Sequence, residues 1–357
     1  MLTWIVAVLV ACGPLVATEG GLASGQPADR AVGEDTETVA DGCPSSSSKP
    51  EVAPKKTQKQ KKDADRTRAV WKQHPSIRVG SAFRLDFKAL FQEDAHASDA
   101  AATGLDMFEL RKNRIGVSGN FFKTVEYEVE RELTDKQVEA TKTQKSQWKD
   151  AYVNVKAIKN AQIQAGRFKV PFGGDELTSM AQSDFVYRSL GARYLAPGRD
   201  VGAMVHGRFF EHGLNYWAGV FAHDGDHSRS SKTQGGDQTV AARVTGRPLR
   251  SLGAGSLELG TAVAVSSLSD ESFEPNGLRG RTVLTQDTFF HPVYVKGQRR
   301  RWESDVNWTA GPASARAEVT WVNDDRRHQG IGDEDLPDAR ARSWYVAGGW
   351  ILRGERT

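Results

Sequence analysis

The sequence predicts an all-β fold, a transmembrane antiparallel β-barrel, from three observations. Apolar and polar residues alternate with a period of two over segments far longer than the five or six residues typical of soluble sheets. Short turns and long polar links alternate between these segments, as the periplasmic turns and extracellular loops of outer-membrane barrels do. Beyond the N-terminus no run of 18 apolar residues occurs, which excludes a helical membrane protein.

The N-terminal part is predicted to lie outside the barrel domain, which we assign to residues 76–357. Residues 1–17, MLTWIVAVLVACGPLVA, are expected to form a signal peptide that is cleaved near Ala17, with a lipobox ending at Cys12 as the alternative. Residues 18–75 are expected to form a disordered periplasmic tether, rich in Ser, Ala, Gly and Pro. Its basic stretch PKKTQKQKKDADRTR is interpreted as solvated rather than as a nucleic-acid-binding arm.

Composition bounds the kinds of site that the chain can hold. Its two cysteines, Cys12 and Cys43, are too few for a disulfide framework or a cysteine metal site. The eight histidines lack metal-ligand spacing, and no Ser or Asp stands out as a catalytic partner for them. We therefore expect no enzyme activity, metal, cofactor or nucleic-acid partner. The net charge of +3 is nearly balanced, so only the placement of charge can indicate a partner.

The first strand is predicted from IRVGSAFRLDFKALF at 77–91, which places Ile77, Val79 and Phe83 on one face and Arg78 and Arg84 on the other. Two further segments alternate as clearly, FFKTVEYEVEREL at 121–133 and WKDAYVNVKAI at 148–158. The other strands are expected at 108–119, 161–170, 200–210, 214–223, 238–248, 256–267, 296–309, 313–323 and 342–353, which makes about twelve visible strands.

The connections form two classes. Short turns are expected at Gly119-Asn120, Lys159-Asn160, Glu211-His212-Gly213, Ala310-Gly311-Pro312 and, slightly longer, 249–255. Long links are expected at 92–107, 134–147, 171–199, 224–237, 268–295 and 324–341. Because a long link follows the first strand, the N-terminal segment would lie in the periplasm.

Aromatic residues near strand ends agree with a lipid environment. Tryptophan prefers the headgroup level, where its ring is half buried and its N–H stays wet. The chain is therefore expected to have outer-membrane lipid as its surroundings, with these tryptophans at the interfaces: Trp217, Trp308, Trp321, Trp344 and Trp350.

Several segments carry a family resemblance. GRFKVPFG followed by DEL, then YRSLGARYLAPGRDVGAMVHG, LNYWAGVFAHDG, DAYVNVK and SWYVAGGWILRGE, resemble the phosphate-selective porin O and P family from about Ile77 onward. The resemblance implies a sixteen-stranded barrel, a homotrimer, and passage of phosphate or polyphosphate guided by lumenal Arg and Lys. Since about twelve strands are visible and the chain ends in GERT without a terminal aromatic residue, we expect the barrel to be incomplete at its C-terminus.

The candidate site is an anion pathway along the lumen. In many porins the third long link, here 171–199, folds inward, and Pro171 and the following glycines would let the chain leave the strand. Alternation leaves the direction of Arg167 and Lys169 open unless the strand bulges near Gly166, and Arg114 is assigned to the lumen with a bulge nearby. The candidate residues are Arg78, Arg84, Lys88, Arg114, Arg167, Lys169, Arg188, Arg193, Arg199, Arg208, Arg243 and Arg301.

The predicted function is a passive outer-membrane channel for small anions such as phosphate or polyphosphate. Rings of Arg and Lys supply the fixed positive charge that anion selectivity needs. Glu126, Glu128, Glu130 and Glu132 should also face inward, however, and pairs between them and the arginines would make a general, non-selective porin. A barrel enzyme and a structural or anchoring barrel fragment are further alternatives.

Overall fold

The computed structural model describes residues 67–71, 75–95, 108–133, 148–226, 238–249, 255–268, 280–282, 288–290 and 293–352. The expected signal peptide, most of the expected tether, and much of the links expected at 92–107, 134–147, 224–237 and 268–295 therefore lie outside the described residues. No helix within the described ranges is long and apolar enough to cross a membrane.

The described residues form strands almost throughout, as the period-two alternation predicts. Three short helices and 3-10 turns lie between β7 and β8, and one 3-10 turn follows β8. The strands are β1 (Thr67–Trp71), β2 (Pro75–Val79), β3 (Phe83–Ala95), β4 (Phe108–Phe121), β5 (Val125–Glu132), β6 (Trp148–Ile158), β7 (Ala161–Lys169), β8 (Arg199–Phe209), β9 (Leu214–Phe221), β10 (Gln238–Leu249), β11 (Ser256–Leu268), β12 (Gly280–Arg281), β13 (Thr288–Phe290), β14 (Gly297–Ala310), β15 (Ala313–Arg326) and β16 (Leu336–Trp350). The helical segments are α2 (Gly174–Leu177), η1 (Met180–Gln182), α3 (Leu190–Tyr194) and η2 (Phe210–His212).

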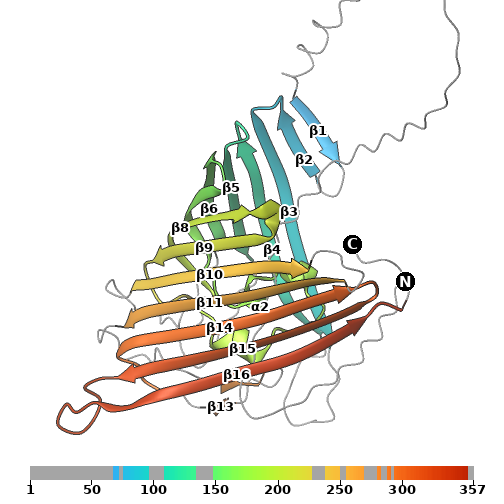
Figure 1. Ribbon diagram of the computed structural model, residues 1–357. Helices are drawn as coiled ribbons and strands as arrows, with labels where there is room; N and C mark the ends of the chain where they lie inside the picture. The colour runs from blue at the N-terminus through green and yellow to red at the C-terminus, as the bar shows by residue number, and fades with distance from the viewer. Residues whose placement is uncertain are drawn as a thin grey trace, which may run out of the picture.

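Fourteen strands pair in sequence order into one antiparallel sheet, β1 to β11 followed by β14 to β16, and β12 and β13 form a separate ribbon. The sheet twists and curls around one side, as Figure 1 shows. In the described part of the chain it is open, with β1 and β16 as its edges. The all-β antiparallel prediction is confirmed, whereas the count of about twelve visible strands was too low.

Two extra strands of the sheet lie at its N-terminal edge, and the β12–β13 ribbon lies within the long link that was expected at 268–295. The segment 77–91 is not one strand, because residues 80–82 turn the chain between β2 and β3, and Gly80 has a φ of 56°. Val79 and Phe83 pair across this hairpin and share a face, so the apolar alternation continues through the turn and conceals it. β1, which pairs with β2, occupies residues assigned to the tether, so the strand region begins at Thr67 and not at residue 76.

Most turns agree with the predictions, with two differences at the ends. β4 runs through Gly119 and Asn120 to Phe121, and the turn lies at 122–124, where Phe122 and Lys123 have positive φ. β15 and β16 are longer than expected, so their link shrinks to 327–335. From β3 onward, the long links connect the strands at one end of the sheet and the short turns connect them at the other, because consecutive strands are antiparallel.

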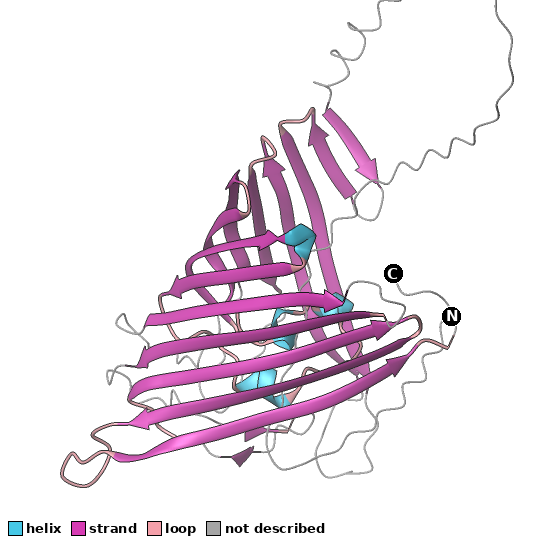
Figure 2. Cartoon of the chain, in the orientation of Figure 1, coloured by secondary structure: helices cyan, strands magenta, loops and turns pink. Residues whose placement is uncertain are grey.

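The two faces of the sheet differ in chemistry. Large apolar side chains such as Phe87, Val220 and Val240 are 41%, 59% and 59% exposed on the outer face, where a soluble protein would cover them. Polar and charged side chains face the inner side, onto which the β7–β8 link also packs (Figure 2). This division is that of a transmembrane barrel wall, with apolar side chains outward and polar ones inward.

Candidate functional site

The third link, residues 170–198, enters the inner side of the sheet as predicted (Figure 1). Val170, Phe172 and Ala196 are fully buried there. They pack in one cluster with Phe168, Met204, Phe221, Ala241, Ala262 and Ala264, which belong to β7 through β11. Further along the link, Leu195 packs on Val322 of β15 and Ala341 of β16. The link therefore crosses the inner wall from β7 to β16, and it narrows the space within the curl.

Glycine at 166 permits the course of β7 into this link. Gly166 has a φ of 130°, which favours glycine, and a Cβ there would lie 2.3 Å from the Ala151 carbonyl oxygen. Beyond it, the Lys169 ammonium donates to the carbonyls of Glu176 and Thr178 in the link. The strand pairing runs through Gly166 without a bulge, so the bulge that the sequence analysis left open is absent, and Lys169 holds the link against the wall.

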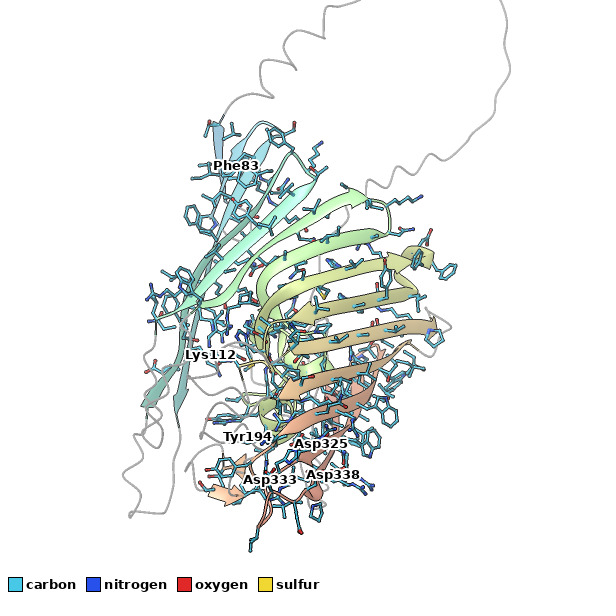
Figure 3. The ribbon with its side chains drawn as sticks, turned by 90° about the vertical axis from the view of Figure 1, so that its left-hand side faces the viewer. Phe83, Lys112, Tyr194, Asp325, Asp333 and Asp338 are labelled. Carbon is cyan, nitrogen blue, oxygen red and sulfur yellow. The ribbon has the colours of Figure 1, made fainter. Side chains whose placement is uncertain are left out.

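Arginines of the link are held within the link itself. The Arg188 guanidinium donates to the Glu176 carboxylate at 2.6 Å and to the Thr178 carbonyl at 2.5 Å. The Arg193 guanidinium lies 5.5 Å from the centre of the Tyr194 ring, a cation–π contact. Figure 3 places Tyr194 near the end of the sheet that carries the β15–β16 link. Both arginines are therefore held by contacts within the third link, and they help to order it.

Asp175, at the start of α2, is a buried carboxyl group in the link, only 2% exposed. It accepts a hydrogen bond of 3.3 Å from the Ser189 backbone N–H. Burial raises the pKa of Asp175 to about 8, although nearby Arg188 acts in the opposite direction. Docking of the link therefore favours the protonated, neutral form of this carboxyl group.

The N-terminal half of the inner wall carries basic side chains that remain partly open to solvent. On β2, Arg78 is exposed. The Arg84 and Lys88 side chains on β3 are 31% and 42% exposed, although each lies 2.9 Å from a carboxylate, Asp86 and Glu128 respectively. Because these pairs are only partly buried, their cations remain accessible to solvent on the inner side.

Arg114 on β4 faces inward, as predicted. It contacts two carboxylates of the row Glu126, Glu128, Glu130 and Glu132 on β5, which we call the glutamate ladder. Its guanidinium lies 3.0 Å from Glu130 and 2.8 Å from Glu132. The expected bulge is present in this strand, since the β3–β4 register skips one residue, Arg111, between the pairs Gln92–Lys112 and Glu93–Leu110. The glutamate ladder on β5 thus faces the same side as the basic residues, as predicted.

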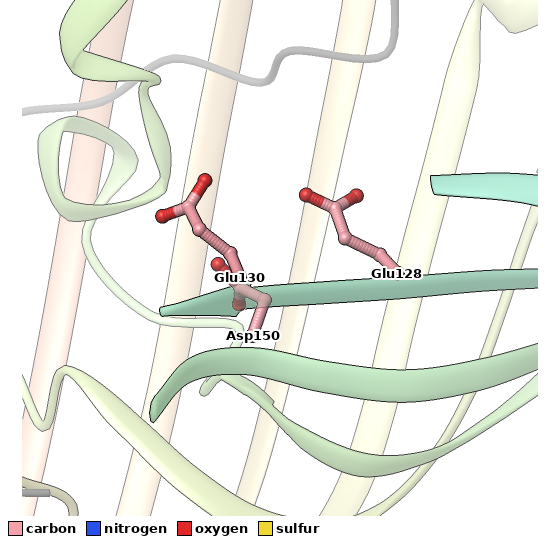
Figure 4. Close-up of side chains that lie close together, drawn as sticks. All are labelled: Glu128, Glu130 and Asp150. Atoms are coloured by element: carbon pink, nitrogen blue, oxygen red, sulfur yellow. The ribbon is translucent and has the colours of Figure 1, made fainter. Parts of the chain in front are cut away.

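Carboxylates of β5 and β6 also gather on this wall. Glu128, Glu130 and Asp150 each place one oxygen within 4.8 Å of the others, and Figure 4 shows them side by side. Each already pairs with a cation of the chain, Asp150 with Arg199 at 2.7 Å, in addition to the pairs of Glu128 and Glu130 described above. These contacts account for the cluster without a metal ion.

Two predicted residues lie at the strand ends beside the third link. Arg167 is buried, and its guanidinium lies 3.0 Å from Asp226 and donates to the Trp148 carbonyl. Arg199, which donates to Asp150 through two nitrogens, begins β8. The Asp226 carboxylate also accepts from the Arg199 backbone N–H at 2.8 Å. This arrangement ties the two ends of the third link to the wall.

The C-terminal half of the inner wall buries Arg243, Arg299 and Arg301 almost completely, whereas Arg316 on β15 is 22% exposed beside Asp184 of the third link. Arg243 on β10 is 2% exposed, and its guanidinium donates to Glu303 at 2.7 Å and to Asp305 at 2.6 Å, both on β14. The intervening strand β11 presents only Ala262 and Gly260 between them. A Cβ at Gly260 would lie 2.1 Å from Asp305 and 2.7 Å from the Arg243 guanidinium, so small residues on β11 make this two-strand reach feasible.

A second buried network centres on Asp224, which follows β9. The Asp224 carboxylate accepts from Arg299 at 2.6 Å, from Arg301 at 2.5 Å, and from the Ser266 hydroxyl. Arg299 also pairs with Asp324 at 2.7 Å. Burial would raise the pKa of Asp224, but the adjacent Arg301 and Arg299 lower it below the ordinary value, so Asp224 stays ionised.

Three further positions, one basic and two aromatic, complete or correct the sequence analysis. Arg208 lies exposed near the short-turn end of β8. Trp217 is not at the lipid interface: it packs against the inner cluster of Phe168 and Ala241, because its register partners are His206 and Arg243. Trp302, which the sequence analysis did not single out, lies on the outer face instead, stacked on Trp321.

Sequence reasoning missed the carboxylates that neutralise the C-terminal arginines. Arg299, Arg301, Glu303 and Asp305 stand two residues apart in QRRRWESD, so the alternation places all four on one face. That spacing was a usable signal for Glu303 and Asp305. Asp224 had no such signal, since it follows β9 and reaches β14 only in the folded sheet.

The chain matches a known protein-family model. The model of the family described as phosphate-selective porin O and P matches residues 77–357, which is most of the chain. No curated protein matches the chain significantly. The matched region covers the sheet from within β2 to β16 together with the third link.

Proposed function

Because the chain belongs to the phosphate-selective porin O and P family, an outer-membrane channel family and not an enzyme family, we propose that its inner wall guides small anions such as phosphate or polyphosphate. The observation that carries the proposal is the set of partly exposed cations on β2 to β4. We call Arg78, Arg84, Lys88 and Arg114 the basic track.

The basic track runs along the strands rather than around one ring. Arg78 pairs in register with Arg84, Lys88 follows four residues later, and Arg114 pairs with Leu90 two residues beyond that. At about 3.3 Å per residue, the track spans roughly 20 Å from Arg84 to the level of Arg114. An anion can therefore pass from one cation to the next without losing all of its charge partners at once.

The carboxylates beside the track keep binding weak. Each cation of the pairs Arg84–Asp86 and Lys88–Glu128 already has a partner, so a phosphate must compete with a fixed carboxylate. Weak binding is what conduction needs, because an ion that binds tightly does not leave. Arg188 and Arg193 on the third link would line the narrowest part of the path beside the buried α2.

We assign Arg243 and Arg301 to the wall rather than to the path. Their side chains are each 1% exposed and are enclosed by carboxylates, so a passing anion cannot reach them. The same holds for Arg167, which is 8% exposed beside Asp226. These residues support the channel by holding strands and the third link together.

A general, non-selective porin is the second candidate, favoured by the glutamate ladder on β5. Lys88 and Lys156 each lie against one of its members and Arg114 lies against two, so that the fixed charges nearly cancel. Such a wall would pass small solutes of either sign. The two candidates differ in ion selectivity, which is directly measurable.

The test is planar-bilayer conductance of the full chain, purified folded from membranes. We expect discrete current steps, a reversal potential in a KCl gradient that reports anion preference, and block by millimolar phosphate. Steps without preference or block would favour the general porin. A folded, heat-modifiable protein that gives no steps would contradict both channel proposals and favour an anchoring role.

Three companion proposals concern assembly and topology. We propose that residues 1–17 are a signal peptide, that the N-terminal segment lies in the periplasm, and that the chain assembles as a homotrimer. N-terminal sequencing of the mature protein tests the first, and protease access in intact and lysed cells tests the second. Light scattering of the purified protein tests the third, where a monomer mass would contradict it.

A further inference from the structure

An arginine cluster lies on the outer face of the sheet, opposite to the proposed path. Arg300 on β14 and Arg340 on β16 flank Asn323 of β15 in one cross-strand row. Arg342 lies in the next row, across from Trp321. We call Arg300, Arg340 and Arg342 the outer arginine cluster.

These arginines face outward because their neighbours along each strand face inward. Arg301 and Ala341 are 3% and 4% exposed on the inner side, whereas Arg300, Arg340 and Arg342 are exposed. Cross-strand pairing then places the three arginines on one continuous patch. The patch is hollowed by a shallow depression of about 210 Å³, several times the roughly 30 Å³ that one water molecule occupies.

An aromatic pair adjoins the cluster on its membrane-facing side. The rings of Trp302 and Trp321 stack at 4.3 Å between centroids and 14° between planes, and Trp302 is 45% exposed. The Trp302 N–H donates to Thr261, so its polar atom is satisfied on the outer face. Exposed tryptophans of this kind mark the lipid headgroup level.

The local charge on the patch is positive. Asp325 pairs with Arg300 at 3.1 Å and also with Arg327 at 3.0 Å. Asn323 accepts from Arg340 at 3.2 Å and donates to Asp338 at 3.0 Å. Figure 3 shows Asp325 and Asp338 close together at this end of the sheet. The cluster thus holds more guanidinium groups than the two carboxylates can neutralise.

The position of the patch relative to the membrane follows from the connections. The patch adjoins the β15–β16 link, at the end of the strands that carries the long links, which is the extracellular end in outer-membrane barrels. Lipid on that side has phosphorylated headgroups beside the tryptophan level. Guanidinium groups pair with two phosphate oxygens at once, and they are the preferred side chains for such a headgroup.

We propose that the outer arginine cluster binds the phosphorylated headgroup of an outer-leaflet glycolipid, whose acyl chains pack beside Trp302 and Trp321. The depression between Arg300, Arg340 and Arg342 receives the phosphate, and the outward apolar residues below receive the chains. This inference rests on the outer-membrane placement of the family and not on the selectivity of the channel. A non-selective pore would leave it intact.

The test is native mass spectrometry of the full chain in detergent with added lipid A, a diphosphorylated glycolipid. The triple variant R300S/R340S/R342S removes the cluster. R131S is the matched control, because Arg131 also lies over a tryptophan, Trp148, on the outer face near the long links, but its register partners are Ile115 and Trp148 rather than arginines. Heat-modifiable migration on gels verifies that each variant is folded.

We expect wild type and R131S to retain the lipid, and the triple variant to lose at least about tenfold in retention, which is the effect of losing one charged-pair interaction or more. Phosphatidylcholine should not be retained, and millimolar inorganic phosphate should not displace lipid A. Equal retention by the folded triple variant, displacement by inorganic phosphate, or a dimer mass that disappears in the triple variant would each overturn the proposal, the last in favour of a second copy of the chain.

Discussion

The two halves of the inner wall use similar residue types in different ways. On β3 the Lys88 side chain is 42% exposed beside Glu128, whereas on β10 the Arg243 side chain is 1% exposed beside Glu303. The third link packs over the inner side of β7 to β11 and reaches β15 and β16. Whether a charged side chain on the inner face stays accessible to solvent or is buried therefore depends on the segments that cover it.

The comparison also explains the small residues of the C-terminal half. Ala262 and Gly260 lie between Arg243 and its two carboxylates, and Ala264 lies between Ala241 and Arg301. Side chains on alternate strands meet over these positions, which excludes water. On β4, Gly116 has the same place between Lys88 and Glu130, but there the ion pairs stay wetted. Small residues are thus necessary for the buried pairs but do not suffice.

The largest expected effect comes from breaking a buried pair. R243M leaves Glu303 and Asp305 buried without their cation, which should lower the free energy of unfolding by about 3–5 kcal/mol. K88M, the matched change in the exposed half, should cost only ~0–1 kcal/mol. Urea unfolding in lipid vesicles, followed by tryptophan fluorescence, measures both. Similar losses in the two variants would mean that burial does not distinguish the halves.

The next largest loss of stability is expected at Gly166 on β7, the strand between the two halves of the inner wall. Alanine at this position combines a φ of 130° with a contact of 2.3 Å to the Ala151 carbonyl, so G166A should lower the free energy of unfolding by about 1–3 kcal/mol. G311A is the control, since Gly311 also has positive φ but a Cβ there meets nothing within 4 Å. If G311A lowers the free energy of unfolding as much as G166A does, the positive φ alone explains the loss, and the close packing at Gly166 on β7 contributes nothing.

Selectivity should depend on the exposed half. R84Q/K88Q removes two cations of the basic track, so the anion preference should fall several-fold while stability changes little, because both pairs are partly exposed. R300Q on the outer face provides a control for the loss of charge alone. Reversal potentials in a KCl gradient report the result. If the anion preference of R84Q/K88Q were unchanged, the anion path could not run along this half of the wall.

The last prediction concerns the pH dependence of the third link. Since burial raises the pKa of Asp175 to about 8, the folded state binds its proton more tightly than the unfolded chain does. Its contribution to stability is therefore complete below about pH 4 and is lost as the pH rises toward 8. The melting temperature should fall from pH 5 to pH 9, and D175N should reduce this fall. D184N, which changes an exposed carboxyl group, should leave this fall unchanged. If the melting temperatures of wild type, D175N and D184N fell equally with pH, Asp175 could not be the group responsible.

Much of the fold was predictable because it rests on local alternation. The strands β3 to β11 and β14 to β16 follow a period of two, and one face must be apolar for lipid and the other polar. The bulge near Arg114 was likewise predicted, and the inward course of the third link was expected from porins, with Pro171 and its following glycines letting the chain leave the strand. The hairpin at 80–82 escaped because Val79 and Phe83 stay on one face through the turn.

The sequence by itself determined which residues face inward, including Arg243, Arg301 and the basic track. Only the tertiary structure decided which of them remain accessible. Exposure depends on partners from distant strands, such as Asp224 for Arg301 and Glu303 for Arg243, and on whether the third link covers them. Alternation reports the direction of a side chain from its own strand, whereas neutralisation and burial are properties of strand pairing and of packing between segments far apart in the chain.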